Sequence, residues 1–325
     1  MSSYSLDFPF AWGGPKQTAG FRFDAEDFIV DELMLQPLSG EGEHLWLHIQ
    51  KRGENTEWVA KKLAEFFSVK KMDVGYGGKK DRHAVTSQWF SIYMPGKSHD
   101  FDWNEFIKVS ALDAKLLACS SHNKKLRMGE HDANKFVIRL RKLELNHGLE
   151  QQLQAIAQHG VPNYFGEQRF GRGGANLERV EEWVKDPRAL RNRNTRSILM
   201  SSARSYLFNK VLGDRVLSGD WQSMLNGDPE ELASGPLWGR GRSLAADECL
   251  AQEVSALEEF ELWRLALENV GLNQQRRDLV LQPSNFKWQV DGADLILTLA
   301  LRPGQFATAV LRELAILEQP ERGQG

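Results

Sequence analysis

Strand-like patterns stand at both ends of this 325-residue sequence, and helical patterns fill the stretch between them. Alternating apolar residues predict strands within residues 27–35, 43–51, 84–94 and 134–143, and again at 286–290 and 294–301. The last two segments flank Asp291-Gly292, a strong hairpin turn. The simplest interpretation is that this late hairpin returns to complete the sheet begun in the first half of the chain.

Helical periodicity predicts a capped helix at 55–67 and another at 149–160 that stops at Gly160. Beyond a loop rich in Gly, Arg and Asn, the pattern is mostly helical, at 177–185, 195–218 and 248–270, and a short helix at 307–317 closes the chain. We therefore expect one domain built from residues 1–159 and 281–325, interrupted by a largely helical insertion at 160–280.

The charges are segregated although the formal net charge is only −3. Such segregation allows a positive face on a nearly neutral molecule, which suits a phosphate backbone. Each cationic run is also compatible with an ordinary solvated surface. The runs are Lys70, Lys71, Lys79, Lys80 and Arg82; Lys124, Lys125 and Arg127; and Arg188, Arg191, Arg193 and Arg196.

No familiar metal or cofactor motif is present in the sequence. Cys119 and Cys249 are far apart and form no CxxC pair. His44 and His48 have the spacing of helical metal ligands, but they lie in a strand-like pattern with no third ligand nearby. The start of the chain lacks the features of a secretory signal, and no apolar run reaches about 18 residues. We expect a cytoplasmic protein that uses no metal and no cofactor.

The stretch "GYGGKKDRHAVTSQWFSI", residues 75–92, contains a glycine-rich cationic loop with one acid, Asp81. It is not a P-loop, because Gly78-Lys79 is followed by Lys80, nor a dinucleotide fingerprint, because a strand follows it. Surrounding cations keep a carboxylate ionised and hold an anionic substrate beside it. The loop thus suits work on the sugar of a nucleotide, although Asp81 could also be only a turn residue.

Two further stretches, "HDANKF" and "PNYFGEQRFGRGG", combine amide side chains, aromatic rings and arginines. Amides can read the edge of a base, and aromatic rings can stack on a base that has left its helix. Phe136 and Phe165 in these stretches are equally compatible with the protein core.

Together these stretches resemble the TruD family of tRNA pseudouridine synthases. The loop is similar to the family signature, usually GYAGxKDRxAVTxQ, and the other blocks match in the family's order: "EDFIVDE", "HDANKFVIRLR", "GVPNYFGEQRFG" and "RPGQFATAVLREL". The blocks extend over nearly the whole chain. Gly77 replaces the commoner alanine, and Gln305 stands where a small residue is usual, but neither change removes a reactive group.

The resemblance implies an α+β pseudouridine synthase catalytic fold, a mixed sheet with flanking helices in permuted strand order, and an inserted, largely helical TRUD domain. It implies Asp81 as the catalytic aspartate, and Arg22 lies where the family more often has a lysine near that aspartate. Contacts to the target nucleotide are implied for Phe28, Asn134 and Phe306. We further expect five cations to contact phosphates: Lys79, Lys80, Arg82, Arg169 and Arg172.

The implied reaction converts uridine to pseudouridine in tRNA, at position 13, without a redox step. Three chemical routes stay open for Asp81: addition to the sugar carbon, addition to the base, or abstraction of a sugar proton. No membrane and no obligate protein partner are expected. Two rival functions remain at this point, an RNA-binding module whose Asp81 is structural and a uracil-DNA glycosylase-like hydrolase that releases free base.

Overall fold

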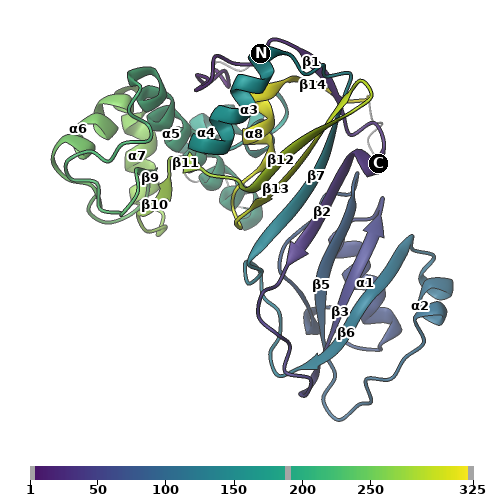
Figure 1. Cartoon of the computed structure of the whole chain (residues 1–325). Helices are drawn as coiled ribbons and strands as arrows, with labels where there is room; N and C mark the ends of the chain where they lie inside the picture. The colour runs from purple at the N-terminus through teal and green to yellow at the C-terminus, as the bar shows by residue number, and fades with distance from the viewer. Residues whose placement is uncertain (1–3, 187–191, 321–325) are drawn as a thin grey trace. The chain divides into compact units, whose positions relative to one another are not determined.

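The computed structural model describes residues 4–186 and 192–320, and the chain forms two compact units (Figure 1). The sheet unit consists of residues 16–150, residues 283–304 and the chain from residue 315. The helical unit consists of the chain up to residue 15, residues 151–282 and residues 305–314. Each unit is thus assembled from segments that are far apart in the sequence.

A ten-stranded mixed sheet forms the sheet unit. Its central path runs β12-β13-β7-β2-β5-β3-β6, while β4 pairs with β5, and β1 pairs with both β14 and β7. The pairs β2–β5 and β1–β14 are parallel and the others are antiparallel. The strands are β1 (Thr18–Phe21), β2 (Phe28–Leu33), β3 (His44–Arg52), β4 (Val74–Tyr76), β5 (Val85–Tyr93), β6 (Ala114–His122), β7 (Ala133–Arg141), β12 (Ser284–Asp291), β13 (Asp294–Leu301) and β14 (Ile316–Glu318).

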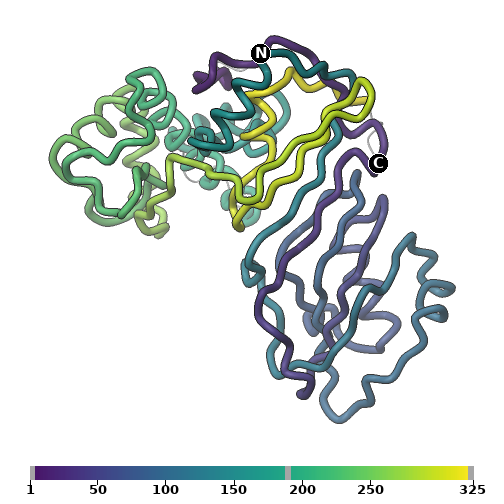
Figure 2. The backbone as a smooth tube through the Cα atoms, viewed as in Figure 1, coloured from purple at the N-terminus to yellow at the C-terminus, as the bar shows by residue number. Residues whose placement is uncertain are grey.

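The late hairpin does return to the early sheet. β13 lies antiparallel to β7, with Leu297 opposite Ile138, and the backbone trace shows the late hairpin beside β7, with β12 on the far side of β13 (Figure 2). Gly292 in the turn has φ of +64°, a conformation that costs glycine little. The expected strands and the mixed α+β architecture are therefore observed.

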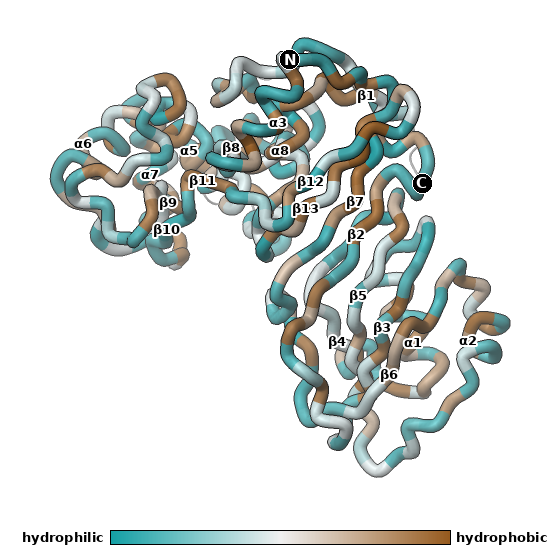
Figure 3. The backbone as a smooth tube through the Cα atoms, viewed as in Figure 1, coloured by the Kyte–Doolittle hydropathy of each residue, from teal (hydrophilic) through white to brown (hydrophobic). Residues whose placement is uncertain are grey.

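One face of the sheet is covered by α1 (Thr56–Phe66) and α2 (Trp103–Ser110). Helix α1 begins at Asn55, whose side chain accepts a hydrogen bond from the backbone N–H of Trp58. Its apolar residues pack against buried residues of β3 and β5 such as Leu47 and Phe90. Figure 3 shows the corresponding hydrophobic segments in α1 and along β7. Because strands alternate their side chains, every second residue of β3 faces this core.

The helical unit contains most of α3 (His147–His159) together with α4 (Ala175–Lys185), α5 (Arg193–Ser218), α6 (Asp247–Ala256), α7 (Glu261–Glu268) and α8 (Ala307–Leu314). Its core lies along α5, where Phe208 and Leu212 are fully buried. Two short strand pairs complete it: β8 (Val161–Pro162) with β11 (Val280–Leu281), and β9 (Ser234–Leu237) with β10 (Gln275–Asp278).

Two details of this unit differ from the sequence-based expectation, and a third expectation lies partly outside the described residues. The helix expected at 248–270 is split into α6 and α7 by a turn of 3-10 helix at Glu258–Phe260. Strands β9 and β10 occur inside the segment expected to be helical. Of the cationic run at 188–196, Arg188 and Arg191 lie outside the described residues, and Arg193 begins α5.

The units also divide the chain differently from the boundaries expected at residues 160 and 280. Helix α8 and the first 15 residues cluster with the helical unit. The cause is a set of hydrogen bonds: Arg312 donates to the backbone carbonyl of Phe8, and the Glu313 carboxylate accepts from the backbone N–H groups of Ala11 and Trp12. The assignment of catalytic and TRUD roles to particular segments stays a prediction.

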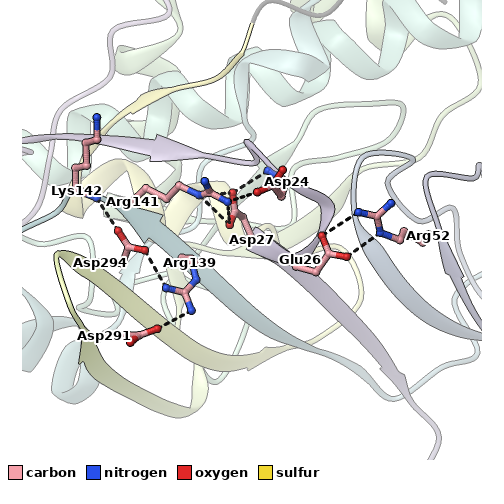
Figure 4. A network of polar contacts seen from close by, with 9 residues as sticks. All are labelled: Asp24, Glu26, Asp27, Arg52, Arg139, Arg141, Lys142, Asp291 and Asp294. Carbon is pink, nitrogen blue, oxygen red and sulfur yellow. Dashed lines mark hydrogen bonds and ion pairs between the residues drawn. The ribbon is translucent and has the colours of Figure 1, made fainter.

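Ion pairs hold the turn before β2 and the β12–β13 hairpin against β7 (Figure 4). Arg141 pairs with Asp24 and with the buried Asp27, at 2.9 Å for the latter. Two residues earlier on the same face, Arg139 pairs with Asp291 at 2.7 Å and with Asp294 at 2.8 Å. The network therefore fixes where β2 begins.

Replacing Arg141 with Met should lower the free energy of unfolding by roughly 1–3 kcal/mol, because the buried Asp27 would lose its cation. Arg139→Met should cost less than about 1 kcal/mol, since its partner Asp291 is largely exposed. Urea unfolding of both variants measures the difference, and equal losses would contradict the role given to Asp27.

Candidate active site

The loop that carries Asp81 joins β4 to β5, and two glycines let it lie close to the rest of the sheet unit. A Cβ atom on Gly75 would stand 2.2 Å from the backbone oxygen of Leu126, so that no other residue fits there without a shift. A Cβ atom on Gly77 would stand 3.1 Å from Nδ1 of His131 and 3.3 Å from Oε2 of Glu32. The two glycines thus allow this segment to lie close to other residues of the sheet unit.

Asp81 is held by one contact to each carboxylate oxygen. Its Oδ2 forms an ion pair with Arg22 at 2.7 Å, and its Oδ1 accepts a hydrogen bond of 2.8 Å from the backbone N–H of His83. The Asp81 side chain keeps 27% of its surface exposed. A carboxylate has about four lone-pair directions, so that it can hold these two partners and still contact a substrate.

Arg22 is itself held firmly although its backbone is strained. It follows β1 with φ of +59°, a conformation that costs a non-glycine residue about 1–2 kcal/mol. Its guanidinium lies over the ring of Phe28, 4.1 Å from the centroid, and 4.7 Å from that of Phe21. Strain of this kind persists only where surrounding contacts enforce it, which is common at functional sites.

Phe28 therefore has a different place from the one expected of a residue that stacks on a base. It is buried, with Arg22 over its ring and the rings of Phe21 and Phe136 beside it. In this arrangement Phe28 supports the cation that pairs with Asp81.

A buried polar chain links β2, the Asp81 loop and β7. The Lys80 ammonium pairs with the Glu32 carboxylate at 2.7 Å and donates to Oδ1 of Asn134 at 2.7 Å. Nδ2 of Asn134 in turn lies 3.1 Å from Nε2 of His131. Burial and the nearby Lys80 lower the pKa of His131, which favours the neutral imidazole that can accept from this amide. The chain fixes which way the Asn134 amide faces.

This placement corrects the expectation that Lys80 contacts phosphates. Only 5% of the Lys80 side chain and none of the Glu32 side chain is exposed, so that the ammonium has almost no surface to offer RNA. Lys79 and Arg82 do lie on the surface; Lys79 pairs with Glu57 at 2.8 Å, and Arg82 donates to the backbone oxygen of Gly53 at 3.4 Å.

Neutral side chains hold the backbone of the same loop. The hydroxyl of Thr56 accepts from the backbone N–H of Lys80 at 2.9 Å and donates to Gln88 at 2.8 Å. Gln88 then donates to the backbone oxygen of Gly78 at 3.0 Å. The loop is therefore fixed from both α1 and β5.

Three of the expected site residues belong to the helical unit. Phe306 is 37% exposed and lines a cavity of about 450 Å³. Phe165 and Arg169 line the same cavity, and the Arg169 guanidinium lies 5.5 Å from the Phe165 ring centroid. Although Arg169 as a residue is exposed, partial burial of its guanidinium lowers its pKa. Arg172 lies on the surface and does not line the cavity.

His44 and His48 lie on the sheet as strand residues, beside aromatic rings. His48 stacks on Trp89 with centroids 4.8 Å apart, and His44 lies 4.9 Å from Tyr93. Among the described residues no group of three or more His, Cys, Asp or Glu is arranged to hold a metal ion. In the part of the chain that the structure describes, no helix is long and apolar enough to cross a membrane.

The sequence analysis missed four polar residues of this site: Glu32, Lys51, Gln88 and His131. The sequence did contain a signal for the three strand residues, Glu32, Lys51 and Gln88. Each is a charged or amide residue at a core-facing position of an otherwise apolar alternation. Such a position is costly to fill with a polar group unless that group has a partner.

Changing Glu32 to Gln should lower the free energy of unfolding by about 3–5 kcal/mol, because it leaves the Lys80 cation buried without a carboxylate. The exposed pair supplies the control: Glu57→Gln, which removes the partner of Lys79, should leave stability close to the unmodified protein. Chemical denaturation of both variants tests this, and a neutral Glu32→Gln would disprove the buried-pair account.

The chain is similar to known proteins over nearly its whole length. Residues 9–185 match the family model described as tRNA pseudouridine synthase D (TruD). The tRNA pseudouridine synthase D of Cellvibrio japonicus is 47% identical, with 99% of this chain and 96% of the relative covered, and that of Aeromonas hydrophila is 41% identical, with 96% and 94% covered. A crystal structure from Methanosarcina mazei, provisionally assigned to TruD, has a TM-score of 0.69 at 20% identity and shares the fold over 94% of this chain and 95% of its own.

Proposed function

The chain belongs to the tRNA pseudouridine synthase D (TruD) family, an isomerase family that acts on uridine in tRNA, and we propose that Asp81 starts cleavage of the glycosidic bond of uridine 13. The observation that carries this proposal is the Asp81 carboxylate, paired with Arg22 at 2.7 Å and still partly exposed. No other carboxylate in the glycine-rich loop 75–84 competes for the role.

The chemistry of the reaction fits a site with one carboxylate paired with a cation. The bond from N1 of uracil to the ribose carbon breaks, the base turns over, and C5 joins the same carbon while its proton is lost and N1 regains one. Asp81 can serve by attack on the sugar carbon, attack on the base, or removal of a sugar proton. No electrons pass to an external acceptor, so that the reaction needs no redox cofactor.

Asn134 is proposed to hold the edge of the target nucleotide. Its amide is oriented by Lys80 on one side and His131 on the other, so that its remaining hydrogen-bonding capacity is presented in a fixed direction. Phe28 acts indirectly, because its ring supports Arg22. Such a fixed arrangement reduces the reorganisation that the reaction would otherwise require.

The helical unit is proposed to bind part of the same RNA. The cavity beside Phe306 combines two aromatic rings, the guanidinium of Arg169, and hydroxyl and amide side chains. Rings that stack on a base and a cation that meets a phosphate are the usual components of a site for an unpaired nucleotide. Surface cations Lys79, Arg82 and Arg172 would contact the backbone without reading its sequence.

Asp81→Asn should abolish pseudouridine formation while tRNA binding persists, because the amide keeps the size of the side chain but loses its charge. The product is measured in tRNA from a strain that lacks the protein, as an isomer of unchanged mass. A variant that retains more than about a tenth of the activity would return Asp81 to a structural role. Released uracil in place of the isomer would identify a hydrolase.

Arg172→Ala should weaken binding of all tRNAs alike and reduce the slope of log affinity against log salt by about one unit, since it removes one phosphate contact. Phe306→Ala should leave that slope unchanged and weaken stacking by about 1–3 kcal/mol, with the loss mainly in turnover. Circular dichroism must first establish that both variants are folded. A salt slope that is unchanged by Arg172→Ala would exclude that contact.

A further inference from the structure

Lys51 is a buried lysine directly behind the Asp81 loop. It lies near the end of β3 on the same face as Leu47 and Ile49, and only 1% of its surface is exposed. Its ammonium donates to the backbone oxygen of Glu54 and lies 3.4 Å from the backbone oxygen of Asp81. The second contact is long for a hydrogen bond, but the charge still faces the carbonyl dipole.

A lysine is rarely buried, because removal of its charge from water is costly. Burial lowers the pKa of Lys51 to about 8, while Asp81 and Glu54 raise it and Lys80 lowers it. Arg22 contacts the carboxylate of Asp81, whereas Lys51 faces its backbone oxygen. The proposed reaction assigns no role to Lys51, and its position at the end of an apolar face gives no packing advantage over a leucine.

We propose that Lys51 is a positioning residue of the proposed reaction, whose buried ammonium holds the Asp81 loop in place and supplies a second positive charge behind the carboxylate. Arg22 binds the carboxylate of Asp81, and Lys51 faces the backbone oxygen of the same residue from the interior. The inference rests on the proposed function, because it concerns how Asp81 is kept ready to react.

Two consequences distinguish this role from simple packing. Lys51 is too deeply buried to touch RNA, so that its removal should lower kcat and leave KM unchanged. Its charge should also set an upper pH limit, because deprotonation removes the positive charge. Above about pH 8 the turnover of the unmodified enzyme should fall about tenfold per pH unit, as for any single required proton.

Stability should change with pH in the opposite direction. Because the pKa of Lys51 is lower in the folded chain than in the unfolded chain, the unfolded chain binds more protons between about pH 8 and the usual lysine value. The contribution of Lys51 to stability therefore rises with pH through this window. Activity that falls while this contribution rises cannot be attributed to loss of the fold.

The experiment compares the full chain with Lys51→Met and Lys51→Arg, using pseudouridine formation in one unmodified tRNA from pH 6.5 to 9.5. We expect Lys51→Met to lower kcat about 10- to 100-fold, as for a misplaced catalytic group, with unchanged KM and no fall above pH 8 beyond the one that all variants share. Lys51→Arg should keep its activity at high pH, because a guanidinium stays charged there. Lys61→Met, at an exposed position on α1, should match the unmodified chain throughout.

Titration of the RNA itself affects all variants alike, so that the difference between profiles isolates Lys51. A high-pH fall that is as steep in Lys51→Met as in the unmodified enzyme, or a Lys51→Met variant with normal kcat, overturns the proposal. If neither Lys51 variant folds, the dependence of kcat on pH in the unmodified enzyme tests the proposal. A kcat that stays constant between pH 7 and 9.5 is incompatible with it. Absence of pseudouridine from the unmodified enzyme would instead refute the proposed function.

Discussion

The buried ion pair between Glu32 and Lys80 connects the parts of the sheet unit that must meet for a site to exist. Glu32 belongs to β2, Lys80 to the loop before β5, and the same ammonium reaches Asn134 on β7. Because both charges are almost completely removed from water, neither can move away without leaving the other uncompensated. The pair thus converts three separate chain segments into one rigid surface on which Asp81 is displayed.

The cations around the Asp81 loop also differ in how deeply they are buried. Cations occur at three levels around the Asp81 loop: Lys79 and Arg82 in solvent, Arg22 at the carboxylate, and Lys80 and Lys51 inside. Interactions of the outer cations are screened by salt, whereas those of the inner cations are not. The cations at 79–82 therefore lie in two environments, because Lys79 and Arg82 are in solvent whereas Lys80 is buried against Glu32.

Much of this could be predicted from the sequence. Alternation along β2, β3, β5, β7 and β13 identified the strands, and the glycine-rich loop with one acid drew attention to Asp81, whose catalytic role stays a prediction. The extent to which each charged side chain is buried could not be predicted. Lys80 and Lys79 are neighbours with the same chemistry, yet one is buried and the other is exposed, because the loop turns between them and only one meets Glu32. The grouping of α8 with the start of the chain could not be predicted either, since the hydrogen bonds between them leave no periodic pattern.

The pairing of β1 with β14 has a consequence for the biogenesis of the protein. Thr18 lies opposite Ile316, so that the edge of the sheet formed by β1 is completed by a strand that is synthesised much later. The β12–β13 hairpin likewise joins a strand, β7, that was synthesised much earlier. Contacts between such distant segments form late and slowly. During translation the edges of β1 and β7 that β14 and β13 later cover therefore stay open, and an open strand edge can pair with another chain.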